Sequence, residues 1–173
     1  QLPDGRTAYR WSQELRGWIT EMDQVTTFGP DGTIAALTVR GVTMSGDAAE
    51  EFRVANGRAS WKTANDAGEA AAGGWYIPAG GVGIANAPLI DAHAAGGDAG
   101  LAFLPSGKGR MTFGPTEVIQ GPGGPKTVQL AFISGILPSP LPVWLDENKR
   151  HFADISYISV IPAGYVGGLK QLR

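Results

Sequence analysis

Alternation of apolar and polar residues is the clearest pattern in this chain, and it is most regular between residues 126 and 133. There Val128, Leu130 and Phe132 recur at every second position. A period of two places these side chains on one face of an extended strand. The pattern predicts a half-buried strand whose core-facing side carries these three residues.

Two turn signals predict hairpins in the first 65 residues, which have the character of β-structure throughout. Residues 29–32 read Gly-Pro-Asp-Gly, with proline second and glycine fourth, which suits a type I turn leading into a return strand at 34–42. Asn56-Gly57 separates the runs 52–55 and 58–61. Asn-Gly is the strongest short hairpin signal, because both turn residues need positive φ.

Residues 82–95 are the best helix candidate. Asn86 is suited to the N-cap, Pro88 would then lie in the first turn, and Gly96-Gly97 would end the helix. A helix that began earlier would be kinked at Pro88. The preceding segment, 65–74, is rich in alanine, glycine and polar residues and is expected to be a loop.

Short strands fill most of the remainder, and no βαβ alternation is visible. The expected fold class is α+β, mostly β: a curved antiparallel sheet of short, hairpin-connected strands packed on one central helix. The length suits a single domain over residues 1–173, with 165–173 a candidate linker to a downstream domain. The further strands are expected at 75–77, 101–104, 110–113, 117–119 and 157–161, with a loop at 121–125 and a short helix or linker at 162–172.

The stretch 134–156 brings carboxylates, cations and a histidine close together in sequence. Its apolar arms, 141–145 and 152–155, flank the charged tip Asp146-Glu147-Asn148-Lys149-Arg150. This pattern predicts two paired antiparallel strands with an exposed tip that does no chemistry. Trp144 and Phe152 are expected to be buried.

Composition excludes several function classes. The chain has 173 residues, 43% of them hydrophobic and 17% charged, with a net charge of −2 and no cysteine. A near-neutral chain has no basic field for nucleic acid or an anionic membrane, and disulfides and thiol nucleophiles are excluded. No apolar run approaches the roughly 20 residues that span a bilayer. The chain begins at Gln1, which fits a mature or trimmed form.

No residue is assigned a catalytic, cofactor-binding or metal-binding role. His93 and His151 have no second histidine at zinc-ligand spacing, so neither is expected to bind metal. Residues 81–86 faintly resemble a dinucleotide-binding loop but lack its third glycine and its parallel strands. Ser134 has no nucleophile motif around it and is expected to be a hydrogen-bonded hydroxyl.

The aromatic residues allow two interpretations. They are spread over the expected strands, where such side chains usually fill a core. A concave aromatic sheet could instead hold an apolar small molecule. The residues concerned are Trp11, Trp18, Trp61, Trp75, Trp144, Phe28, Phe52, Phe113, Phe132 and Phe152.

An ordered series of short motifs over roughly residues 30–165 resembles the β-rich region that precedes the catalytic barrel in exported bacterial amidohydrolase-superfamily proteins. The order of the motifs carries most of the resemblance. In sequence they are Glu51-Phe52, 57–62 (GRASWK), 75–78 (WYIP), Leu104-Pro105 with Gly107, 133–136 (ISGI) with Pro138, 143–146 (VWLD), Phe152-Ala153 and 161–165 (IPAGY).

In that family the metal ligands begin with a His-x-His pair in a later barrel, and this chain stops at Arg173 before any such segment. The resemblance therefore implies a non-catalytic accessory region without cofactors, in a periplasmic or secreted setting. The implied partners are a downstream catalytic domain or another copy of the chain. The alternative is a freestanding module that binds an apolar small ligand.

Overall fold

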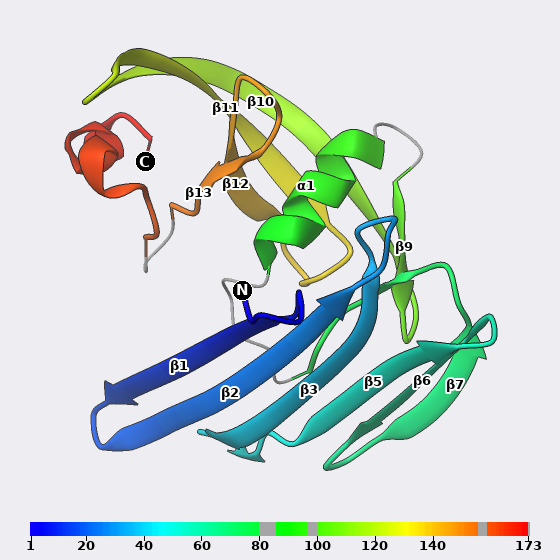
Figure 1. Ribbon diagram of the computed structural model, residues 1–173. Coiled ribbons are helices and arrows are strands. Elements are labelled where there is room, and N and C mark those ends of the chain that lie inside the picture. Colours follow the sequence, from blue (N-terminus) through cyan, green and yellow to red (C-terminus); the bar gives the residue numbers. More distant parts are fainter. Residues whose placement is uncertain (80–85, 97–99, 156–158, 173) are drawn as a thin grey trace. The chain divides into compact units, whose positions relative to one another are not determined.

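The computed structural model describes residues 1–79, 86–96, 100–155 and 159–172. Their contacts group into two compact units (Figure 1). Unit 1 comprises residues 1–86 and 102–107, and unit 2 comprises 87–101 and 108–173. The chain therefore passes from one unit to the other at three places. The expected single domain remains a prediction, and each unit is described here by itself.

Unit 1 contains an antiparallel sheet in the order β1-β2-β3-β5-β6-β7, with β4 paired to β3 (Figure 1). Each neighbouring pair within this path is antiparallel. The strands are β1 Thr7–Leu15, β2 Trp18–Phe28, β3 Ile34–Thr43, β4 Gly46–Asp47, β5 Glu50–Ala55, β6 Arg58–Thr63 and β7 Ala67–Ala71.

Both predicted hairpins are present in unit 1. The N–H of Gly32 donates to the carbonyl of Gly29 over 3.0 Å, closing the turn between β2 and β3. Asn56 and Gly57 have φ values of 51° and 74°, as a type I′ turn requires. Phe52 pairs with Trp61 in the resulting hairpin. The local turn chemistry therefore fixes these two connections.

The expected loop at 65–74 was wrong, because β7 occupies its centre. Gly68 pairs with Trp61 on β6, and a Cβ built at Gly68 would lie 2.4 Å from the Trp61 ring. Glycine therefore lets the indole approach the β7 backbone closely. A strand of alanine, glycine and one glutamate has little hydrophobic alternation, so the pattern did not reveal it.

Two further strands complete unit 1 on one face of its sheet. β8, Trp75–Tyr76, pairs in parallel with β9, Leu101–Leu104. The ring of Tyr76 stacks on Phe52, with centroids 4.1 Å apart. This stack joins β8 to the buried face of β5 and defines the interior of the unit.

Unit 2 is built on strands β10 to β13 with two helical elements (Figure 1). β10 pairs with β11, β11 with β12, and β12 with β13, all antiparallel. The elements are α1 Asn86–Gly96, β10 Lys108–Gly121, β11 Gly124–Ser134, β12 Leu141–Asp146, β13 His151–Ala153 and the 3₁₀ helix η3 Ala163–Lys170.

The predicted strands at 110–113 and 117–119 are parts of one strand. β10 continues through both, and its register with β11 shifts between Phe113 and Thr116. Pro115 lies at this irregularity and has no N–H to donate to a ladder. The proposed loop at 121–125 is likewise shorter than expected, since Gly121 and Gly124 already pair.

Apolar clusters lie on both faces of the unit 2 sheet. One includes Ile90 of α1 with residues of β10, β11 and β12, and the other gathers the C-terminal segment around Trp144 and Phe152. The predicted pattern of buried residues in β11 is therefore only partly observed. Val128 is buried, but Phe132 on the same face is 36% exposed, whereas Ala131 and Ile133 on the opposite face are fully buried. A strand covered on both faces does not follow a simple alternation.

The predicted fold class, α+β and mostly β with curved antiparallel sheets, is confirmed. α1 contributes Ile90 to the unit 2 core, as a packed helix should. Segment 162–172 contains η3 rather than only extended linker, and Leu172 is buried in the same cluster as Trp144. The predicted strand at 157–161 lies partly outside the described residues.

Candidate functional site

The chemically most distinctive contact in unit 1 is a buried carboxyl group beside a buried phenol. Glu50 is 1% exposed and Tyr76 is 2% exposed. The Tyr76 hydroxyl donates to Glu50 Oε1 over 2.6 Å, and the Ala79 N–H donates to the same oxygen over 3.1 Å. Two strands distant in sequence, β5 and β8, are thereby joined by one side chain.

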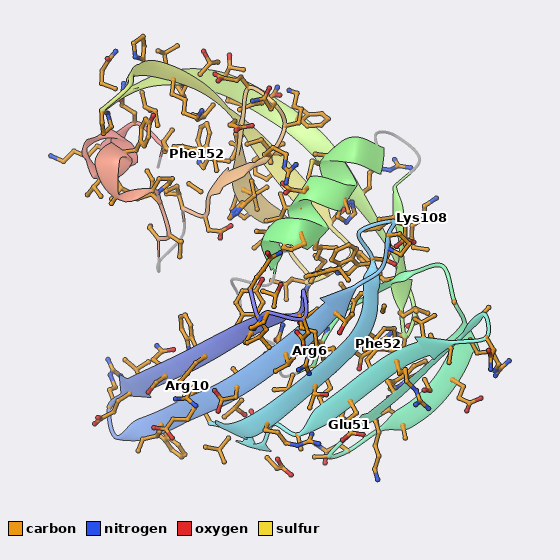
Figure 2. All side chains as sticks on the ribbon, viewed as in Figure 1. Arg6, Arg10, Glu51, Phe52, Lys108 and Phe152 are labelled. Carbon is orange, nitrogen blue, oxygen red and sulfur yellow. The ribbon has the colours of Figure 1, made fainter. Side chains whose placement is uncertain are left out.

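The strand register explains why Glu50 is buried. Gln24, Val39 and Glu50 are aligned across β2, β3 and β5, so their side chains leave the sheet on the same face. Phe52 lies two residues further along β5 on this face, whereas Glu51 points to the opposite face (Figure 2). The side chain of Gln24 in turn donates to Thr26 Oγ1 over 3.1 Å.

Burial determines what the Glu50–Tyr76 pair can do. Desolvation, followed by the hydrogen bond to Glu50, raises the pKa of Tyr76 well above its usual value of 10.0. The phenol is thus held protonated as a donor. With both groups almost fully buried, a substrate could not reach them, and the pair is suited to fixing β8 on the sheet.

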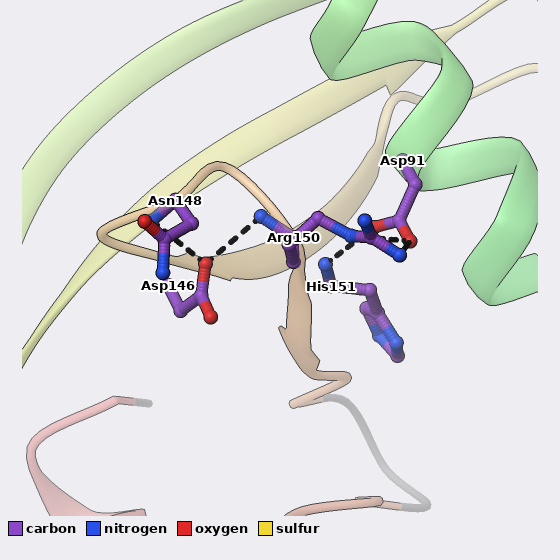
Figure 3. Close-up of polar contacts among 5 residues, drawn as sticks. All are labelled: Asp91, Asp146, Asn148, Arg150 and His151. Carbon is purple, nitrogen blue, oxygen red and sulfur yellow. Dashed lines mark hydrogen bonds and ion pairs between the residues drawn. The ribbon is translucent and has the colours of Figure 1, made fainter.

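A second polar cluster joins the predicted tip in unit 2 to helix α1 (Figure 3). Asp91 Oδ2 accepts from Arg150 Nε over 2.9 Å, and Asp91 Oδ1 accepts from the His151 N–H over 2.7 Å. The Arg150 Nη2 atom also lies 2.9 Å from Asp91 Oδ2. Two guanidinium nitrogens thus contact one carboxylate oxygen, and a backbone N–H donates to the other.

The tip itself is organised by Asp146. Its Oδ1 atom accepts from the N–H groups of Asn148 and Arg150, both over 2.9 Å (Figure 3). Lys149 is the positive-φ residue of the turn, with a φ of 61°. Its ammonium group contacts Gln129 and lies 5.0 Å from the Phe113 ring centroid. Glu147 Oε1 lies 3.6 Å from Lys126 Nζ on β11. The charged residues of this turn therefore have structural contacts within the tip, to α1 or to neighbouring strands.

The predicted strand pairing around this tip is confirmed. Trp144 pairs with Ala153 and Leu145 with His151. Trp144 is 4% exposed and Phe152 is 9% exposed, in agreement with the expected burial. The link from the tip to Asp91 was not predicted, because the partners are 59 and 60 residues apart in sequence.

The two histidines lie in different settings within unit 2. His93 is buried in α1, and desolvation lowers its pKa. His151 Nε2 lies 3.2 Å from Asp154 Oδ1. Within the described residues, no three histidine, cysteine or acidic side chains gather as a metal site. The absence of metal ligands remains a prediction for the whole chain.

The outer face of the unit 1 sheet forms an open trough of about 690 Å³. Four of its lining residues are charged, namely Glu51, Arg53, Lys62 and Glu69. Two of them form ion pairs with arginines beside the trough: Arg40 Nη2 lies 2.6 Å from Glu51 Oε1, and Arg58 Nη2 lies 3.0 Å from Glu69 Oε2. All four paired side chains are exposed, so each pair contributes little stability. The trough has the character of a solvated sheet face.

Ser134 and the dinucleotide-like loop at 81–86 are the other two candidates from the sequence. The Ser134 hydroxyl donates to the carbonyl of Arg110 over 3.2 Å, in agreement with the expected hydrogen bond. Residues 81–85 of the proposed dinucleotide-like loop lie outside the described residues.

Sequence reasoning missed Glu50 and Asp91, the acceptors in the two clusters. A signal for Glu50 was present, because residues 50, 52 and 54 share a face of their strand and two of them are apolar. Asp91 offered no such signal, since its partners come from a distant hairpin.

Comparison with protein-family models, with curated proteins and with solved structures returned no match to this chain. No helix in the described segments is long and apolar enough to cross a membrane.

Proposed function

We propose that this chain is a non-catalytic accessory region of the kind that precedes the barrel in exported bacterial amidohydrolase-superfamily proteins. The observation that carries the proposal is the set of contacts that Asp91 makes with Arg150 and with the backbone of His151. The Asp91 carboxylate pairs with the Arg150 guanidinium and accepts from the backbone N–H of His151, so these contacts join α1 to the β12–β13 hairpin. Their contacts support a scaffold in which charged groups fix the positions of elements.

The positions of the family-like motifs also support this proposal. Phe52, Trp75 and Trp144, which belong to three separate motifs, are all buried. Tyr165, from the last motif, packs edge-on against Phe152, with centroids 5.2 Å apart. The resemblance therefore rests on residues that build the two interiors, as expected for a shared framework.

The alternative function, a module that binds an apolar ligand, has weaker support. The trough on the outer face of unit 1 has the volume for a small molecule, but Glu51, Arg53, Lys62 and Glu69 line it. Sites for apolar ligands are mostly lined by hydrophobic side chains. Four charged side chains make this trough a poor match for an apolar ligand. The proposed accessory role has a downstream catalytic domain as partner and a periplasmic or secreted location.

Metal analysis of the purified chain tests the non-catalytic role. The expected result is no stoichiometric zinc and no hydrolysis of ester or amide substrates. Zinc held at one ion per chain, and lost in His93→Ala or His151→Ala variants that melt normally, would contradict the proposal.

The coding sequence downstream of Arg173 tests the attachment to a hydrolase. The expected result is a barrel sequence with a His-x-His pair near its start. In that longer protein, Glu147→Ala and Asn148→Ala should leave turnover unchanged. Loss of turnover without loss of stability would assign the tip a functional role and reject the scaffold interpretation.

A further inference from the structure

Strand β1 forms one edge of the unit 1 sheet, and its length makes that edge available for pairing (Figure 1). β1 has nine residues, contains no proline or lysine, and pairs with β2 without a register shift. The opposite edge strand, β7, has only five residues. Natural proteins usually shorten, bend or charge an exposed edge to prevent pairing. β7 is protected by its length, whereas β1 is long and its two charged residues, Arg10 and Glu14, have opposite signs.

The turn after β1 shows which of its backbone groups point away from β2. Arg16 and Gly17 have φ values of 53° and 83°, so they form a two-residue turn flanked by the pair Leu15 and Trp18. In such a hairpin the flanking pair is hydrogen-bonded, and hydrogen-bonded pairs alternate along the ladder. Odd-numbered residues of β1 therefore bond to β2, and even-numbered residues present N–H and C=O groups outward.

A second copy of β1 can bond to these outward groups in an antiparallel, two-fold symmetric arrangement. Even residues must then face even residues. When Ser12 faces Ser12 of the second copy, Arg10 faces Glu14, and this pair occurs twice by symmetry. Neighbouring registers oppose Arg10 with Ser12 or with Arg16, which gives no charge pair or a like-charge pair. One register is thus selected by charge.

The side chains of β1 are suited to this register. The Arg10 side chain is 81% exposed and contacts Asp23 at 2.7 Å on the outer face (Figure 2). In the pairing it would lie between Asp23 of its own chain and Glu14 of the other. On the opposite face, Leu15 is 43% exposed and would lie beside Tyr9 of the second copy.

We propose that two copies of this chain associate through antiparallel pairing of their β1 strands, centred on Ser12 and specified by two Arg10–Glu14 pairs. The paired strands would join two unit 1 sheets into one continuous sheet. This inference concerns a different surface from the proposed accessory role and does not depend on it.

Charge reversal on the full chain tests the register. Wild type is expected to form dimers in sedimentation experiments extending to about 0.5 mM, a range that covers weak association. Arg10→Glu and Glu14→Arg each place like charges opposite one another twice, and each should weaken the dimer at least about tenfold. An equimolar mixture of the two variants restores opposite charges in both pairs and should recover the dimer. The double variant should also dimerise by itself.

The matched control is Arg58→Glu, which makes the same charge change and removes a cross-strand ion pair with Glu69 on the far side of the sheet. It should leave dimerisation unchanged, and circular dichroism establishes that all variants fold. A monomeric wild type over the whole range would overturn the proposal. Dimers insensitive to charge reversal, or single variants that fail to associate when mixed, would also overturn it.

Discussion

The two units of this chain stabilise their sheets by different means. Unit 1 buries Gln24, Thr26 and Glu50 together with Leu37, Val39 and Phe52 on one face of its sheet. Unit 2 covers its sheet on both faces with apolar clusters and joins α1 to a hairpin through partly exposed Asp91.

This difference affects how each unit responds to substitution. A buried carboxyl group needs its donors, so unit 1 should be sensitive to changes of a single polar atom. Apolar clusters respond instead to lost volume, and unit 2 should be most sensitive to truncation of a large core side chain. Hydrogen exchange measured separately for each unit distinguishes these responses.

The largest expected effect is in unit 2. Trp144→Ala removes a 4% exposed indole from the cluster around Phe152 and Leu172. It should lower the free energy of unfolding by about 3 kcal/mol or more, because the cavity cannot fully close. Thermal melts and exchange rates of unit 2 amides measure the loss. Trp18→Ala is the control, since Trp18 is 59% exposed, and an equal loss in both variants would contradict the core assignment.

The corresponding change in unit 1 removes one oxygen. Tyr76→Phe keeps the stack on Phe52 but deprives Glu50 of a donor at 2.6 Å. Loss of a buried hydrogen bond to an acidic group should lower stability by about 1.5–3 kcal/mol. Tyr9→Phe on β1 is the matched control and should change stability little. A neutral effect of Tyr76→Phe would remove the proposed contrast between the units.

The same residue gives unit 1 a pH dependence. Because the pKa of Tyr76 is raised in the folded state, that state retains a proton that the unfolded chain releases above about pH 10. The associated stability is therefore present below pH 10 and is lost as the pH rises further. Alkaline titration of stability should show a shallower decline in Tyr76→Phe than in wild type.

A smaller effect is expected at the β5–β6 turn. Gly57→Val places a β-branched residue at a φ of 74° and should cost about 1 kcal/mol or more through backbone strain. A Cβ at Gly57 would meet no neighbouring atom within 4 Å, so the effect would report conformation rather than a clash. Unchanged thermal stability would show that the turn tolerates valine.

The smallest effects should come from the tip in unit 2. Glu147→Ala and Asn148→Ala alter exposed side chains and should each cost less than about 0.5 kcal/mol. Asp91→Ala, which removes the acceptor for Arg150 and His151, should cost more than either. If all three variants melt alike, the link between the hairpin and α1 contributes no stability.

The sequence predicted those features that depend on neighbouring residues. Asn56-Gly57 specifies its hairpin through the φ values of two residues, and the apolar arms around 146–150 specify their pairing. β7 could not be predicted in the same way, because alanine and glycine carry almost no alternation and its position depends on Trp61.

The candidate clusters were less predictable than the strands. Contact between Asp91 and Arg150 spans 59 residues, and nothing in the local pattern relates them. Burial of Glu50 depends on the register of three strands together with the position of Tyr76. Such contacts arise from tertiary structure, so composition and spacing cannot supply them.

The chain crosses from one unit to the other three times, and this determines the order in which the two units can be completed during synthesis on the ribosome. Unit 1 needs residues 102–107, including Phe103 beside Trp75, so it stays unfinished until the segment containing α1 has been synthesised. A fragment ending at Asn86 would lack β9 and leave β8 without its parallel neighbour. Neither unit is therefore a contiguous stretch of the gene, and a chain that ended between Asn86 and Ala102 would leave both units incomplete.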